Sequence, residues 1–190
     1  MEFYMFKVLI TTVPFSVKNN LPLELLESAN IEYLINPLNK KLTEDELVEM
    51  ITDFDAIIAG TEKITKKVMD AATNLKMISR VGIGLDSVDL LEAKRQGILV
   101  SYTPDAPAPA VAELTIGFML TLLRSTQLSN MEMHNGKWHR FFGRRLSEVT
   151  IGIIGVGRIG IGLLKHLQGF GSPKILVNDV DFNSDLDKKF

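Results

Sequence analysis

The chain has 190 residues, 46% of them hydrophobic, and its 21 basic and 23 acidic side chains give a net charge of −2. This composition is typical of a globular protein, and the small net charge excludes a global field that would recruit nucleic acid or an anionic membrane. There is no cysteine, so disulfides, a thiol nucleophile and a thiolate metal site are excluded, and we expect no metal centre. The N-terminal residues do not form a secretion signal, so we expect a cytoplasmic protein.

Strand-like and helix-like patterns alternate along the first hundred residues. Thr43 and Glu46 have the spacing of a capping box and predict a helix that begins there. Strands are predicted over 7–13, 31–37, 55–60, 75–82 and 98–104, and helices over 22–29, 42–54, 65–74 and 88–97. Strands that alternate with helices indicate a parallel sheet covered on both faces. We therefore predict a doubly wound, flavodoxin-like α/β domain over residues 1–104.

The pattern changes after this domain. Pro104, Pro107 and Pro109 exclude a helix before the last of them, and an apolar helix is then predicted up to about Arg124. This helix is shorter than a membrane span and contains Glu113, so we expect no membrane insertion. A polar and aromatic arm without clear periodicity follows, and a strand pattern returns at Val149.

The stretch "GIIGVGRIG" carries a dinucleotide-binding signature. Gly155, Gly157 and Gly160 form G-x-G-x-x-G between an apolar strand and an amphipathic helix, which is the context that this motif requires. The first glycine makes the tight turn, the second admits the pyrophosphate, and the third lets helix and strand pack closely. A further strand ends in Asp179, where an acid that binds the ribose hydroxyls is expected, and this acid favours NAD over NADP.

A second glycine-containing turn, "RVGIGLDSVDL", follows the fourth predicted strand. Its backbone N–H groups from Val81 to Gly84, with Arg80 beside them, could form a nest for a carboxylate or a phosphate. A plain connection in which Asp86 or Asp89 caps the next helix explains the same residues. The spacing does not choose between these two interpretations.

Four motifs in order, "RVGIGLDSVDL", "TPDAPAPAVAELTIGFMLTLLR", "NGKWHRFFGRRL" and "IGIIGVGRIG", resemble the NAD-dependent D-2-hydroxyacid dehydrogenases, in particular their phosphoglycerate dehydrogenase-like members. The resemblance extends from Lys7 to Asp179 and implies hydride transfer between NAD and C2 of a D-2-hydroxy acid. It also implies that residues 105–190 hold a dimerisation helix and arm followed by the first part of a Rossmann NAD-binding domain.

The resemblance also implies roles for individual residues. By this resemblance, the substrate-binding residues of the chain are Arg80, Val81, Gly82, Ile83 and Gly84. By the same resemblance, the cofactor-binding residues are Gly155, Gly157, Arg158, Ile159, Gly160 and Asp179. Among them, Arg158 and Ile159 are expected to contact the pyrophosphate. Residues 107–145 match the segment through which members form homodimers, and the mixed basic and aromatic "HRFFGRR" within it favours a subunit contact over nucleic acid.

The sequence departs from the family in two ways. Pro107 and Ala108 stand where many members carry an asparagine and a serine near the substrate, which leaves the substrate preference open, phosphoglycerate included. The catalytic arginine, histidine and carboxylate of the family lie beyond the ribose acid, so we assign no catalytic residue here and expect an N-terminal portion that is inactive alone. His134, His139 and His166 are expected to be surface or packing residues. The alternative is a non-catalytic, NAD-sensing regulatory protein on the same fold.

Overall fold

The computed structural model describes residues 5–180, which divide into two compact units. The boundary falls between Pro104 and Asp105, within the proline-containing stretch. Each unit has its own hydrophobic cluster.

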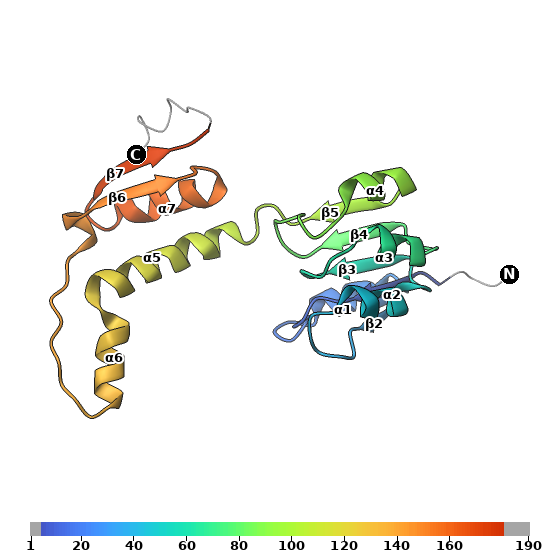
Figure 1. Cartoon of the computed structure of the whole chain (residues 1–190), viewed down its shortest axis with the longest axis horizontal. Helices are drawn as coiled ribbons and strands as arrows, with labels where there is room; N and C mark the ends of the chain where they lie inside the picture. Colours follow the sequence, from blue (N-terminus) through green and yellow to red (C-terminus); the bar gives the residue numbers. More distant parts are fainter. Residues whose placement is uncertain (1–4, 181–190) are drawn as a thin grey trace. The chain divides into compact units, whose positions relative to one another are not determined.

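The first unit is a five-stranded parallel sheet with the strand order β2-β1-β3-β4-β5 (Figure 1). Its strands are β1 (Lys7–Ile10), β2 (Glu32–Ile35), β3 (Ala56–Ala59), β4 (Met77–Arg80) and β5 (Leu99–Tyr102). Its helices are α1 (Leu21–Ser28), α2 (Glu44–Ile51), α3 (Lys66–Ala71) and α4 (Leu90–Gln96). The strand order 2-1-3-4-5 is that of the flavodoxin-like fold, so the predicted fold class is confirmed.

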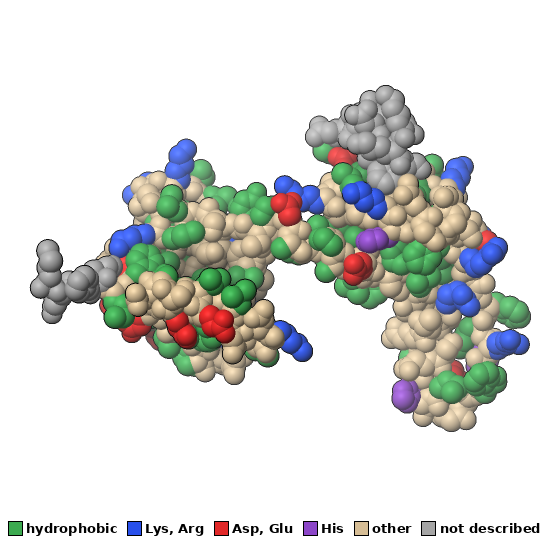
Figure 2. Space-filling model, turned by 180° about the vertical axis from the view of Figure 1, so that it is seen from behind, with side chains coloured by type: hydrophobic (Ala, Val, Ile, Leu, Met, Phe, Trp, Pro, Cys, Tyr) green, Lys and Arg blue, Asp and Glu red, His purple; other side chains and the backbone are tan. Residues whose placement is uncertain are grey.

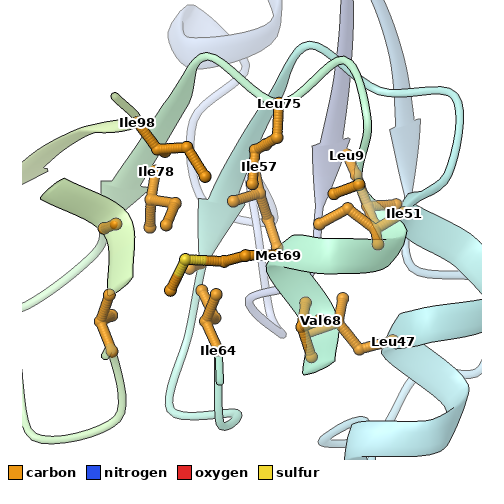
Figure 3. Packing of buried hydrophobic residues seen from close by; sticks show 14 of the residues in the cluster. Leu9, Leu47, Ile51, Ile57, Ile64, Val68, Met69, Leu75, Ile78 and Ile98 are labelled. Atoms are coloured by element: carbon orange, nitrogen blue, oxygen red, sulfur yellow. The ribbon is translucent and has the colours of Figure 1, made fainter. Parts of the chain in front are cut away.

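Both faces of this sheet bury apolar side chains. Leu9, Ile57 and Ile78 project from neighbouring strands toward α2, α3 and α4, and Met69 of α3 lies among them (Figure 3). The alternate residues Val8 and Ile10 pack on the opposite face against α1. A strand buried on both faces needs apolar residues at consecutive positions, which explains the unbroken run in β1.

Local signals set the ends of several helices. The side chain of Thr43 accepts a hydrogen bond from the Glu46 N–H at 3.3 Å, and the Glu46 carboxylate accepts one from the Thr43 N–H at 2.9 Å. The predicted capping box at the start of α2 is therefore confirmed. Asp89 caps α4 by accepting from the Glu92 N–H at 3.0 Å, and Gly97 ends that helix with a φ of 73°. Of the two candidate caps, Asp89 is the one used.

The second unit is a β-α-β arrangement preceded by helices. It contains α5 (Ala108–Arg124), α6 (Thr126–His134), the short 3-10 helix η1 (Leu146–Glu148), β6 (Thr150–Ile154), α7 (Arg158–Gln168) and β7 (Lys174–Asn178). β6 and β7 pair in parallel. One face of this pair packs on α7 and α5. Ile154 and Leu176 of the two strands remain exposed in the part of the chain that the structure describes.

The arm after α5 differs from the expectation. Its first part continues as α6, because only Ser125 leaves the helical conformation, with a φ of 50°, and the two helices meet at a bend of 65°. No single described helix is long and apolar enough to cross a membrane, whereas α5 and α6 reach that length and composition only as a bent pair.

Candidate functional site

The glycine turn between β6 and α7 has the geometry of a dinucleotide site. Gly155 adopts a φ of 89°, which other residues rarely tolerate. A Cβ on Gly160 would lie 2.4 Å from the carbonyl oxygen of Gly155, so only glycine permits this approach of helix to strand. A Cβ on Gly157 would meet nothing within 4 Å, so the space in front of the turn is open. The three glycines thus lie where the motif requires them.

Asp179 is brought to this turn by the parallel pairing of β6 and β7. It directly follows β7, and its Oδ2 accepts a hydrogen bond from the Val156 N–H at 2.5 Å. Val156 stands between the first two glycines of the motif, 23 residues earlier in the chain. The acid and the glycine turn therefore form one site at the carboxyl ends of the two strands.

The start of α7 offers groups that suit a pyrophosphate. Gly157 precedes the helix, and Arg158 and Ile159 occupy its first two positions, where backbone N–H groups have no intrahelical acceptor. The Arg158 side chain is paired with Asp105, with its Nε 2.5 Å from Oδ1. Both side chains are more than half exposed, and such pairs contribute only about 0–1 kcal/mol, so a phosphate could compete for the guanidinium.

The glycine loop after β4 is more constrained than expected. The Val81 N–H donates to the Ala59 carbonyl at 2.9 Å, and the Gly82 N–H donates to the Thr103 hydroxyl at 2.8 Å. The N–H groups of Ile83 and Gly84 have no hydrogen-bond acceptor among the described residues. Of the four N–H groups from Val81 to Gly84 that were predicted to form an anion nest, two are therefore already hydrogen-bonded, and those of Ile83 and Gly84 remain available to a ligand.

Arg80 lies against the inner side of this loop instead of extending beside it. The residue is only 8% exposed, and its Nη1 donates to the Val81 carbonyl. A Cβ on Gly82, where φ is 138°, would come within 2.8 Å of that nitrogen. The Nε of Arg80 is buried without a hydrogen-bond partner in the described part of the chain. Its guanidinium thus supplies positive charge directly behind the loop.

The histidines lie outside these two turns along the chain. His134 ends α6, His139 makes an edge-to-face contact with the Phe141 ring at 4.4 Å, and His166 lies in the last turn of α7. None of the three has a carboxylate partner among residues 5–180. The described residues also contain no group of three or more histidine, aspartate and glutamate side chains that could hold a metal ion.

The chain has an all-parallel sheet of order 2-1-3-4-5, followed by a β-α-β unit with a glycine turn. These features are typical of doubly wound α/β proteins, which bind ligands at the carboxyl ends of their strands. Residues 8–182 match the family model described as "D-isomer specific 2-hydroxyacid dehydrogenase, catalytic domain". The chain belongs to this family, which confirms the resemblance seen in its motifs.

Relatives of known name agree with this assignment. The chain is 37% identical over 151 residues to a hydroxypyruvate reductase of Thermotoga maritima, covering 78% of this chain and 49% of that protein. It is 41% identical over 134 residues to a D-3-phosphoglycerate dehydrogenase of Methanocaldococcus jannaschii, covering 68% of this chain and 25% of that protein. The chain thus spans half or less of the length of these relatives.

A solved structure resembles the fold closely. The crystal structure of NAD+-bound 3-phosphoglycerate dehydrogenase from Entamoeba histolytica matches with a TM-score of 0.78 and 28% identity, covering 96% of this chain and 56% of that one. The matched region therefore includes both units, each of which has a counterpart in an enzyme of this family.

Proposed function

We propose that this chain provides the acid-binding unit and the first part of the NAD-binding unit of a phosphoglycerate dehydrogenase-like D-2-hydroxyacid dehydrogenase. The reaction is reversible hydride transfer between NAD and C2 of a D-2-hydroxy acid. The observation that carries this proposal is the glycine turn of residues 155–160 joined to Asp179 through the Val156 amide. NAD, when bound, supplies the hydride acceptor, while the protein supplies orientation and electrostatics.

The residues of this chain have two tasks in that reaction. At the second unit, the open space at Gly157 and the N-terminus of α7 receive the pyrophosphate, and Asp179 accepts hydrogen bonds from the ribose hydroxyls. At the first unit, the free N–H groups of Ile83 and Gly84, with Arg80 behind them, hold the substrate carboxylate. The names of the relatives, hydroxypyruvate reductase, glyoxylate reductase and D-3-phosphoglycerate dehydrogenase, support a small 2-oxo acid as the substrate.

The direct test is turnover by the full-length protein. Oxidation of NADH is followed with glyoxylate, pyruvate, hydroxypyruvate and phosphohydroxypyruvate, and each product is analysed for the D configuration. The proposal expects enzymatic turnover with at least one of these acids. Binding of NADH without turnover of any 2-oxo acid would instead favour the NAD-sensing regulatory protein.

We also propose that the protein is a cytoplasmic homodimer formed through residues 107–145. Large apolar side chains in that segment are exposed in the single chain, among them Leu122 at 81%, Trp138 at 84% and Phe142, which is fully exposed. Figure 2 shows hydrophobic side chains at several places on one face of the molecule. Burial of such side chains against a second copy would remove apolar area from water. Sedimentation equilibrium of the full-length protein should give twice its chain mass. Replacement of Leu122 and Trp138 by serine should reduce the measured mass to that of the monomer.

Arg80→Ala in the full-length protein is expected to raise the KM for the 2-oxo acid about tenfold or more, and to leave the KM for NADH within about twofold. The reason is that a hydrogen bond or ion pair to a charged group contributes about 1.5–3 kcal/mol, and only the acid is expected near Arg80. Steady-state kinetics with each substrate varied in turn measure both constants. Arg95→Ala on α4 removes the same charge elsewhere in the unit. Equal increases in the KM values for the acid and for NADH would show that Arg80 does not bind the acid.

Asp179→Asn is expected to narrow the preference for NADH over NADPH by about tenfold or more in the full-length protein. Asparagine keeps an oxygen that can accept from the Val156 N–H, but it removes the charge that repels a 2′-phosphate. The ratio of kcat/KM values with the two cofactors measures the effect. An unmodified enzyme that already prefers NADPH would show that Asp179 does not have this role.

A further inference from the structure

An ion pair joins the dinucleotide turn to Asp105, the residue at which the second unit begins. Arg158, the first residue of α7, donates from its Nε to the Oδ1 of Asp105, 53 residues earlier in the chain. Asp105 is the only acidic side chain paired with this guanidinium among the described residues. The cation that is expected to bind the pyrophosphate therefore already has an anionic partner.

The packing of α5 on α7 brings the two residues of this pair together. The Asp105 carbonyl accepts a hydrogen bond from the Ala108 N–H at 3.2 Å, so Asp105 lies in the turn that leads into α5. Ala112, one turn into α5, is fully buried, and a Cβ on Gly162, one turn into α7, would lie 3.2 Å from its Cβ. The N-terminal ends of the two helices therefore lie close together, and the carboxylate reaches Arg158 as a consequence.

The Arg158 guanidinium has two competing anionic partners in this arrangement. One is the Asp105 carboxylate, and the other is the pyrophosphate of the dinucleotide, which is expected at the same turn. Both side chains of the pair are more than half exposed, so water weakens their attraction. A pyrophosphate also accepts hydrogen bonds from the backbone N–H groups that begin α7, so it can displace Asp105 from the guanidinium.

We propose that Asp105 is a positioning residue of the cofactor site, which holds the Arg158 guanidinium in the cofactor-free protein and releases it to the pyrophosphate when the dinucleotide binds. This inference rests on the proposed function only in placing NAD at the glycine turn. The ion pair must break before Arg158 contacts the cofactor. The measured Kd then equals the intrinsic Kd divided by the fraction of molecules in which Arg158 is free, so Asp105 lowers the affinity for the dinucleotide.

Asp105→Asn removes the charge with little change in shape and should lower the Kd of the full-length protein for NADH about two- to fivefold. The same substitution made in an Arg158→Gln protein should change the Kd less than about 1.5-fold, because Asp105 acts through Arg158. Asp53→Asn, at an exposed position of the first unit, is the matched control. Calorimetric titration with NADH measures each Kd. A Kd that Asp105→Asn leaves unchanged or raises, or an equal gain with and without Arg158, would overturn the inference.

The NMR signal of the Arg158 Nε–H reports the partner of the guanidinium directly, and its loss in Arg158→Lys assigns it. Asp105→Asn should shift this signal in the cofactor-free, full-length protein. At saturating NADH, the signal should be the same in Asp105→Asn and in the unmodified protein, because the pyrophosphate is then the partner in both. A difference that persists with NADH bound would show that the ion pair survives, and would overturn the inference.

These measurements separate the role of Asp105 from the proposed function, because they follow binding and not turnover. Turnover of no 2-oxo acid, together with the expected Kd values and signals, would refute the dehydrogenase but support the role of Asp105. An active dehydrogenase in which Asp105→Asn changes neither the Kd nor the Arg158 signal would overturn that role alone.

Discussion

Gly160→Ala is expected to weaken NADH binding by the full-length protein at least about tenfold and to lower the free energy of unfolding by about 1–3 kcal/mol. The new methyl group would lie 2.4 Å from the Gly155 carbonyl oxygen, so α7 must move away from β6. That movement displaces the helix N-terminus from the position at which the pyrophosphate binds. The substitution thus affects binding and packing through one contact.

Gly152→Ala is the matched control, because a Cβ at Gly152 in β6 would meet nothing within 4 Å. Calorimetric titration with NADH measures the affinity, and thermal unfolding followed by circular dichroism measures the stability. Gly160→Ala with the affinity and melting temperature of the unmodified protein would show that the close approach of α7 to β6 is not needed.

The 190-residue chain tested alone is expected to show no measurable oxidation of NADH with any of the four 2-oxo acids. Hydride transfer to C2 must be matched by proton transfer to the oxygen, and a positioned acid–base residue contributes about 10²–10⁴-fold in rate. The three histidines have no carboxylate partner in the described part of the chain, and none lies on the glycine loop or the dinucleotide turn. We therefore propose that no residue described in this chain performs that step.

This prediction is tested by recording the absorbance at the NADH maximum over time with the purified chain and each acid. Triple replacement of His134, His139 and His166 by glutamine provides the control for any residual rate. Robust turnover that this replacement abolishes would show that the chain contains a complete catalytic set. The same assay on the full-length protein shows whether the acids and the conditions are suitable.

The sequence alone was sufficient wherever the signal was local. Apolar periodicity indicated the five strands of the first sheet, and the spacing of Thr43 and Glu46 indicated the start of α2. The glycines at 155, 157 and 160 are also a local signal, because each is required by the backbone of a single turn. Helix α6 was not predicted, because the polar arm shows no amphipathic period and the helix begins after one left-handed residue, Ser125.

Contacts between residues that are distant in the sequence depend on the fold, which sets which groups meet and which are already hydrogen-bonded. Parallel pairing joins Asp179 to Val156 and Thr103 to Gly82. The second contact occupies the Gly82 N–H, which the family resemblance assigned to the substrate. The parallel pairing of β1 with β3 likewise brings Glu62 to Thr11, 51 residues away in the sequence. Both residues line a cavity that no sequence motif indicated. Periodicity and turn residues report the conformation of a few neighbouring residues, whereas hydrogen bonds between distant loops depend on strand order and register. Apart from α6, the main helices and strands were therefore predictable from the sequence pattern, whereas the contacts within the sites depend on the fold.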